Sequence, residues 1–179
     1  MVVFFDKNVG KSYHYRLMSQ NVIVSDPLAF ARDAASLSGE FGSAELPRLA
    51  ASSLELGAVR WHVSGLRLED GRAALEVSAQ GVAVLRCERC LEPMDWVFAV
   101  ARRLSLYRAD ELIPDEELED ESCDAIHFAG TIDVASLVED EILLELPVFA
   151  RHEVCEPPGP WEAGEKPSPF AVLAQLKRS

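Results

Sequence analysis

The strongest constraint on the fold is a set of three strand-like runs, 54–63, 73–85 and 95–107, that follow one another closely. Alternation of apolar and polar side chains indicates strands that bury one face. The alternating apolar positions of the second and third runs are Leu75, Val77, Ala79, Ala83, Leu85, Trp96, Phe98, Val100, Leu104 and Leu106. Asp70-Gly71 is typical of a hairpin turn because both residue types tolerate a positive φ. With a second turn at 87–93, the runs predict an antiparallel meander.

A helix is predicted ahead of this meander. Ser25 or Asp26 can cap its first turn, and Pro27 fits the first helical positions because its fixed φ suits them. Gly39 is expected to end the helix by adopting a left-handed conformation. The stretch from Phe41 to Leu49 contains a proline and is predicted to be irregular.

A short strand at 125–128 and a second helix are predicted after the meander. Thr131 or Asp133 can cap this helix, and Pro147 stops it. Its apolar stripe consists of Val134, Leu137, Val138 and Ile142. Its carboxylates are predicted to form a solvated face and not a metal or acid–base site, because adjacent helical residues point in different directions: Glu139, Asp140, Glu141 and Glu145.

These elements predict an α+β fold, an antiparallel β meander with flanking helices and an extended C-terminal tail. Whether the sheet curls into a partial barrel is left open. Residues 18–156 are predicted to form a single domain with an acidic loop at 110–124. Residues 1–17 lack a regular pattern and are interpreted as a non-native or mis-called leader ahead of Met18. Residues 157–179 are predicted to be a Pro/Gly-rich linker followed by a docking tail.

Composition restricts the class of protein. The chain has 179 residues, 49% of them hydrophobic, which is typical of a folded protein with a sizeable core. Its formal net charge is -13, and the loop at 110–124 carries nine acidic residues and no basic one. Such a charge argues against coating nucleic acid through bulk positive charge. The sequence shows no signal peptide or membrane-spanning run, so a cytoplasmic location is expected.

The cysteines give the sharpest local signal. Cys87 and Cys90 have the CxxC spacing, which directs two thiolates into one tetrahedral site, and His152 and Cys155 repeat it more than sixty residues later. Together they form a complete Cys3His set for structural zinc. Cys123 is an alternative fourth ligand, but it lies in the acidic loop.

Other interpretations of these cysteines stay open. The thiols can pack as small buried apolar groups, or form a redox pair of the thioredoxin type, which would normally lie at a helix N-terminus in a βαβ setting. Nucleophilic catalysis would pair a cysteine with His127 or His152 but lacks a third orienting group. The sequence contains no P-loop, GxGxxG, HExxH or nucleophile elbow.

A basic concentration surrounds the CxxC motif. Arg86, Arg89 and Arg102 are candidates for RNA or partner contact, since guanidinium groups bind phosphate in a bidentate way. Arg102 and Arg103 point to opposite sheet faces, so the arginines cannot all form one patch. Pairing with the acidic loop is the alternative interpretation.

Four stretches together resemble the YceD family. They are Val84–Pro93 around the CxxC motif, Leu137–Pro147 in the second helix, the His152 and Cys155 pair, and Lys166–Lys177 in the tail. Members of this family are associated with accumulation of large-subunit (23S) ribosomal RNA. The order and spacing match from about Asn21 to the C-terminus.

The resemblance implies a non-enzymatic factor in synthesis, processing or stability of large-subunit ribosomal RNA. It implies a partner in ribosome biogenesis, a large-subunit ribosomal protein or a pre-ribosomal particle, with RNA contact mainly indirect because the chain is acidic. Zinc, if bound, is expected to be structural and to close the tail segment onto the meander. The alternative function is a zinc-stabilised protein-interaction adaptor unrelated to ribosome assembly, and a thiol-redox enzyme is the third.

Overall fold

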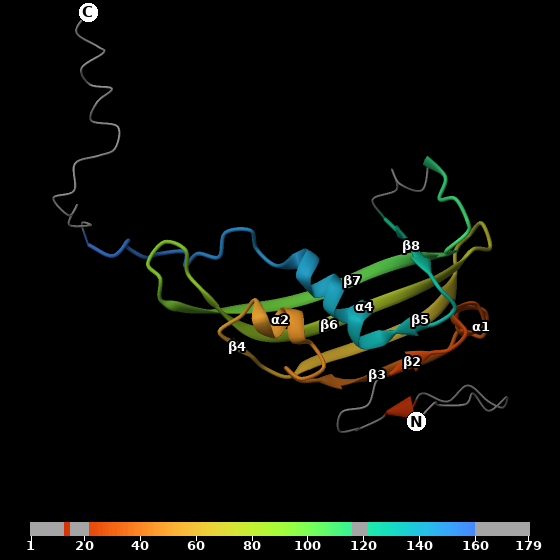
Figure 1. Cartoon of the computed structure of the whole chain (residues 1–179), viewed down its shortest axis with the longest axis horizontal. Coiled ribbons are helices and arrows are strands. Elements are labelled where there is room, and N and C mark those ends of the chain that lie inside the picture. The colour runs from red at the N-terminus through yellow and green to blue at the C-terminus, as the bar shows by residue number, and fades with distance from the viewer. Residues whose placement is uncertain (1–12, 15–21, 116–121, 160–179) are drawn as a thin grey trace, which may run out of the picture.

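The computed structural model describes residues 13–14, 22–115 and 122–159 (Figure 1). Its helices and strands follow one another in this order: β1 Tyr13–His14, β2 Ile23–Val24, α1 Pro27–Arg32, β3 Ser36–Phe41, α2 Pro47–Ala51, β4 Glu55–Leu56, β5 Val59–Arg67, β6 Ala73–Arg86, β7 Pro93–Arg108, β8 Asp124–Phe128, β9 Ile132–Asp133 and α4 Val134–Glu145.

The predicted meander forms the centre of the structure. In a seven-stranded sheet of order β1-β3-β5-β6-β7-β8, the pairs β3–β5, β5–β6 and β6–β7 are antiparallel, while β4 pairs with the other end of β6. The alternation fixes the register, since Val77 of β6 lies opposite Val63 of β5 and both are fully buried. Gly71 in the β5–β6 turn has a φ of +86°, as the Asp-Gly pair predicted.

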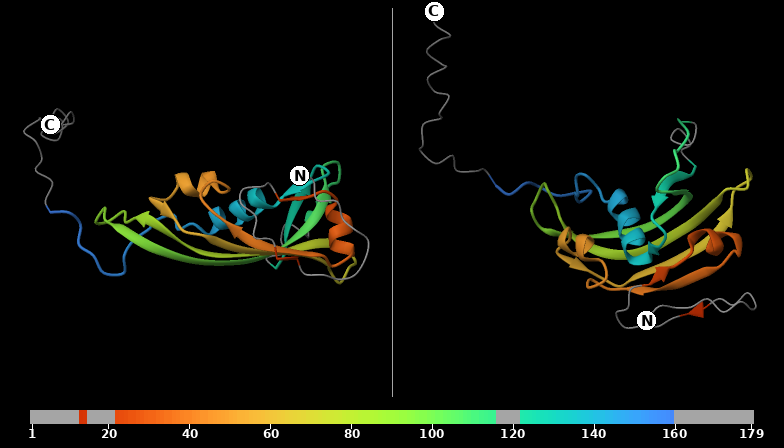
Figure 2. Two further views of the ribbon diagram at one scale, coloured as in Figure 1. Left: turned by 90° about the horizontal axis from the view of Figure 1, so that it is seen from below. Right: turned by 45° about the vertical axis from the view of Figure 1, so that its right-hand side comes forward.

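Helices α2 and α4 cover the concave face of the curved sheet (Figure 2). Helix α4 begins where Asp133 accepts hydrogen bonds from the backbone N–H groups of Ala135 and Ser136, and it ends just before Pro147. Val138 and Ile142 are fully buried, as the apolar stripe predicted. Burying two such side chains stabilises the fold by about 3–6 kcal/mol.

The first helix is shorter than predicted. Helix α1 ends at Arg32, and Ala34 turns the chain at a φ of 47° into strand β3. Gly39 is a strand residue and not a helix stop. A Cβ atom there would lie 3.0 Å from the Trp61 ring, so the glycine makes room for this indole, which stacks on Phe41 at a centroid distance of 4.9 Å.

Two further predictions need correction. The stretch 41–49 is not irregular throughout, because helix α2 begins at Pro47. The helical carboxylates do not form one solvated face, because Glu139 and Glu141 are only 3% and 5% exposed. Glu139 lies against α2, whereas Glu141 points to a different side of α4, near Asp124 and Arg102.

The predicted strand at 125–128 exists as β8 and pairs in parallel with β7. In the described residues the sheet's outer strands, β1 and β8, do not pair, so the sheet does not close into a barrel. The observed architecture is the predicted α+β class. The predicted leader apart from β1, residues 116–121 of the acidic loop and the tail from residue 160 lie outside the described residues. The domain boundaries stay predictions.

Candidate metal centre

The fold brings the CxxC and HxxC pairs together. Cys87 and Cys90 lie in the turn between β6 and β7, and His152 and Cys155 lie in the segment that follows α4. One ligand atom from each residue, a sulfur or a ring nitrogen, lies within 4.8 Å of the other three. These four residues can hold a metal ion.

Backbone hydrogen bonds shape the first half of the cluster. The Cys87 N–H group donates to the Glu92 carbonyl at 2.9 Å, and the Leu91 N–H group donates to the Cys87 carbonyl at 2.9 Å. Leu91 adopts a left-handed φ of 68°, which is costly for a branched side chain. The two hydrogen bonds close the turn, and the sulfurs of Cys87 and Cys90 lie within 4.8 Å of each other.

Hydrogen bonds to backbone carbonyls attach the second half to the first, and one of them runs from the Arg89 guanidinium to the Cys155 carbonyl at 3.5 Å. The Glu88 N–H group donates to the Ala150 carbonyl at 2.8 Å. The Nε2 atom of His152 lies 3.2 Å from the Pro93 carbonyl oxygen. A hydrogen bond from Nε2 to this carbonyl leaves Nδ1 of the neutral ring as the metal-binding atom, as outer contacts commonly do for ligating histidines.

The spacing of the ligand atoms fits a tetrahedral ion. Zinc bonds of about 2.1–2.3 Å place ligand atoms about 3.5–3.8 Å apart. The sulfurs of Cys87 and Cys155 are 3.7 Å apart, and the Cys90 sulfur is 3.4 Å from His152 Nδ1. The widest pair needs to close by about 1 Å, which side-chain rotation can supply.

The environment favours a thiolate at the buried cysteine. Burial acts to raise the pKa of the Cys87 thiol. The N–H groups of Cys90, His152 and Arg89, together with the Cys90 thiol, outweigh burial and lower this pKa to about 5. Burial and the two neighbouring sulfurs raise the pKa of Cys155.

A lowered thiol pKa is also a property of redox cysteines, but two observations disfavour that interpretation. The Cys87 side chain is fully buried, so a substrate disulfide cannot reach its sulfur. The CxxC pair joins two antiparallel strands and does not begin a helix. Cys123 is buried outside the four-residue cluster and is not a fourth ligand.

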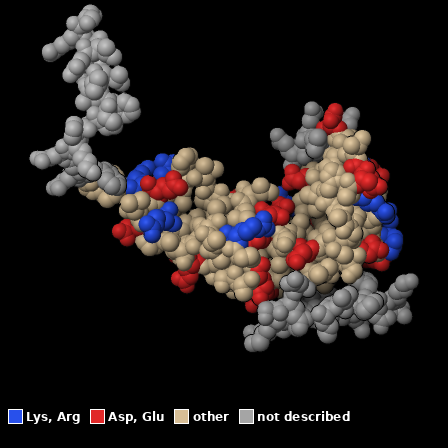
Figure 3. All heavy atoms as spheres, in the orientation of Figure 1, with Lys and Arg blue, Asp and Glu red and all other residues tan. Residues whose placement is uncertain are grey.

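The candidate arginines do not form one patch. Arg86 is exposed, and Arg89 donates to the Cys155 carbonyl at 3.5 Å. Arg102 lies on the concave side and pairs with Glu145 of α4 at 2.9 Å, whereas Arg103 pairs with Glu76 of β6. These two ion pairs are intramolecular, and they involve α4 and β6 and not the acidic loop. On the face shown in Figure 3, basic side chains are few and separated by acidic ones.

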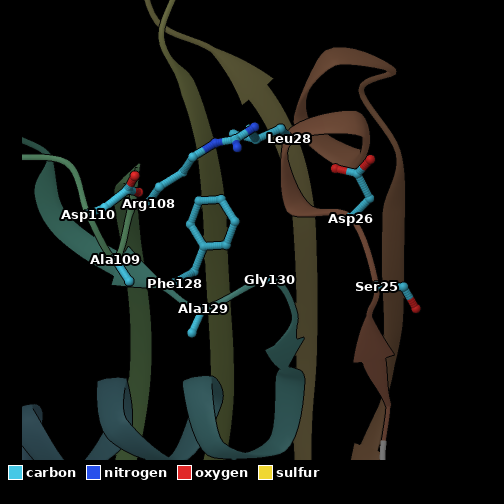
Figure 4. Close-up of a pocket in the computed structure, with 9 residues that line it drawn as sticks. All are labelled: Ser25, Asp26, Leu28, Arg108, Ala109, Asp110, Phe128, Ala129 and Gly130. Carbon is cyan, nitrogen blue, oxygen red and sulfur yellow. The ribbon is translucent and has the colours of Figure 1, made fainter.

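A hollow of about 400 Å³ lies at the other end of the sheet, between α1 and the ends of β7 and β8. In Figure 4, the Arg108 side chain extends above the Phe128 ring towards Leu28. The Asp26 carboxylate at its rim accepts from the Ala29 N–H group and so already caps α1. Ser25 and Asp110, which also line the hollow, lie on opposite sides of it in Figure 4 and do not pair as a nucleophile and a base.

Sequence reasoning identified the four ligand candidates but missed the residues that position them. These are Leu91, with its left-handed backbone, and the two carbonyl groups of Pro93 and Ala150. Carbonyl contacts leave no trace in residue type. The proline that closely follows the CxxC motif is the one available signal, since it ends the turn and begins β7.

A family model matches residues 75–177, a range that contains all four cluster residues and α4. Its description is large ribosomal RNA subunit accumulation protein YceD. The chain belongs to the YceD family. The resemblance seen in the sequence is therefore confirmed.

A curated relative supports the same assignment. The chain is 29% identical over 174 residues to the large ribosomal RNA subunit accumulation protein YceD of Haemophilus influenzae. The match covers 86% of this chain and 94% of the relative. No solved structure matches the chain. In the described part of the chain, none of the helices has the length and apolar character needed to span a membrane.

Proposed function

We propose that this YceD family member is a non-enzymatic factor that supports the accumulation of large-subunit (23S) ribosomal RNA, through its synthesis, processing or stability. The family match carries the proposal, since it spans the C-terminal half of the meander, α4 and the metal cluster. The description of the family and the relative names an accumulation factor and no reaction, which supports a role without catalysis.

We propose further that the protein acts in the cytoplasm through a protein partner, a large-subunit ribosomal protein or a pre-ribosomal particle. A net charge of -13 repels bare RNA at long range. Arg102, one of the three arginines considered for RNA contact, is paired with Glu145. Direct RNA contact through Arg86 and Arg89 is the second candidate, because both guanidinium groups lack an acidic partner in the described residues.

Affinity purification of the tagged full chain from its native host, with half of the sample treated with RNase, tests this role. We expect large-subunit proteins to co-purify and to remain bound after RNase. Loss of all partners after RNase would favour direct RNA contact. Recovery of unrelated proteins alone, in both halves, would favour the adaptor function and contradict a role in ribosome biogenesis.

The cluster of Cys87, Cys90, His152 and Cys155 is proposed to bind one structural zinc ion. The donor set of three sulfurs and one imidazole is typical of closed zinc sites, which leave no position open for catalysis. Bound zinc would hold the segment after α4 against the β6–β7 turn, adding to the hydrogen bonds to the Ala150, Pro93 and Cys155 carbonyls that join them.

Metal analysis of the purified protein tests the zinc proposal. We expect about one zinc per chain for the unaltered protein and a substoichiometric amount for Cys90→Ser, since a structural site needs all four ligands. Cys123→Ser is the matched control because it removes a buried thiol outside the cluster. Equal zinc content in all three proteins would contradict the assignment.

A further inference from the structure

One edge of strand β7 is open over most of its length. Strand β8 pairs with β7 only from Leu104 to Arg108 (Figure 1). From Met94 to Arg103, β7 pairs with β6 on one side and has no strand on the other among the described residues. The chain from Glu145 to His152 is joined to both ends of this stretch, through the Glu145–Arg102 ion pair and the His152–Pro93 contact, but no backbone hydrogen bond joins it to β7. Backbone N–H and C=O groups along this edge therefore lack a strand partner, although the Ala101 carbonyl accepts from the Arg102 guanidinium at 3.3 Å.

The middle of this edge lacks the charged residues and prolines that normally protect an exposed strand. Residues 96–101 contain no charged residue, proline or glycine, although charges, prolines and bulges are the usual means of blocking such pairing. Val97 is 75% exposed and lies opposite Val82 of β6, itself 41% exposed. An added strand would find both hydrogen-bonding groups and apolar side chains to pack against.

Between residues 92 and 101, β7 and the residue just before it carry only acidic charges, whereas Arg86 lies one strand inward on β6 and Arg89 lies in the turn, where it donates to the Cys155 carbonyl. Glu88, Glu92 and Asp95 are exposed and form no ion pair within the described residues. Arg102 lies at the opposite end of the open edge from these acidic residues, and it is paired with Glu145. An incoming segment with basic side chains would therefore be attracted and would meet no free cation on the strand itself between residues 94 and 101.

We propose that the open edge of β7, residues 94–103, binds an extended basic segment of another protein by β-strand addition. Backbone hydrogen bonds to β7 hold the segment, apolar side chains at alternate positions pack on Val97 and its neighbours, and flanking lysines or arginines pair with Asp95 and Glu92. The assignment rests on the proposed function, since it specifies how a ribosomal protein partner would be held.

A pair of variants isolates the edge. Ala99→Lys places a charge on the outer strand, and Gln80→Lys places the same charge directly opposite it on β6, one strand inward. Both side chains are exposed, so neither substitution disturbs the core. The probe is an array of 15-residue synthetic peptides that covers the large-subunit and small-subunit ribosomal proteins of the native host, with acidic peptides as controls.

We expect binding to basic large-subunit peptides, weakened at least about tenfold by Ala99→Lys and much less by Gln80→Lys. Hydrogen exchange of the complex should show new protection confined to residues 94–103. Four outcomes would each overturn the proposal. Two concern the peptide complex: equal weakening of peptide binding by both variants, or hydrogen-exchange protection outside residues 94–103. The other two show a different occupant of the edge: RNA that displaces the peptide, or dimers of this chain that Ala99→Lys dissociates.

The proposed function can fail separately. If the edge binds basic peptides from small-subunit proteins only, strand addition stands and the large-subunit role is contradicted. If Ala99→Lys fully restores the 23S RNA level of a deletion strain, the role stands and β7 is not the partner site.

Discussion

Glu139 of α4 caps helix α2 across the concave face of the sheet. Its Oε1 atom accepts hydrogen bonds from the backbone N–H groups of Arg48 and Leu49 at 2.7 and 3.0 Å, and its Oε2 atom accepts from Arg48 Nε at 2.7 Å. Helix α2 lacks a capping side chain of its own at Leu46. A residue 91 positions away in the chain thus satisfies the first turn of α2.

Glu139→Ala should therefore destabilise the fold by about 2 kcal/mol, because it leaves two helix N–H groups buried without an acceptor. Chemical denaturation measures the free energy of unfolding. Asp140→Ala is the control, since Asp140 reaches the same Arg48 side chain from an exposed position and should cost little. An equal loss in the two variants would show that the ion pair, and not the cap, is what matters.

Glu141 should make stability depend on pH. Burial, with the nearby Asp124, raises the pKa of Glu141 above its usual range; Arg102 opposes this shift and Asp140 adds to it. Its Oε2 atom is buried without a hydrogen-bond partner in the described residues. A carboxyl whose folded pKa is raised favours the fold below its unfolded pKa, and this contribution is lost as pH rises through the folded pKa.

Glu141→Gln should consequently be more stable than the unaltered chain at pH 7, and the difference should shrink as the pH falls towards about 4. Denaturation at a series of pH values measures it. Glu145→Gln, on the exposed part of α4, is the matched control. A Glu141→Gln variant that is less stable at pH 7 would indicate a favourable partner for the carboxylate.

Gly65 lets α1 approach the sheet. A Cβ atom at this position of β5 would meet the Phe30 carbonyl and would lie 2.6 Å from Ala31 Cα, and both contacts are backbone atoms of α1. Gly65→Ala should destabilise the fold by about 1–3 kcal/mol through overpacking. Ser64→Ala, on the neighbouring half-buried position, should change stability by less than about 0.5 kcal/mol. Thermal unfolding that ranks these two variants the other way would contradict the packing.

Zinc should protect the segment after α4 from proteolysis. Arg151 is exposed and lies one residue before His152, so trypsin should cleave after it faster once a chelator has removed the metal. At free zinc a thousandfold above its Kd, Tm should be higher by about 10 °C. The same cleavage rate with and without the chelator would show that metal does not hold this segment.

Local sequence patterns predicted the centre of the fold well. The meander follows from period-2 alternation, the Asp-Gly turn from its conformational freedom, and the start of α4 from Asp133. Each depends on residues close together in the chain. The two halves of the metal cluster were predicted from spacing alone, and their juxtaposition is a result of the fold.

The failures concern interactions between distant segments. Strand β3, at 36–41, lacks alternation because its role is to complete the sheet beside β5, so a continuing helix was predicted there instead. Glu139 resembled a solvated helical acid because its partners, the N–H groups of α2, are backbone atoms that no residue pattern reveals. The open edge of β7 likewise depends on how far β8 extends.

The most direct test of the proposed role is the ratio of 23S to 16S ribosomal RNA in a strain of the native host that lacks this protein. We predict that the ratio falls and that expression of the full chain restores it, without restoration by a chain whose partner site is disrupted. An unchanged ratio in the deletion strain, under conditions where the protein is normally expressed, would contradict the account.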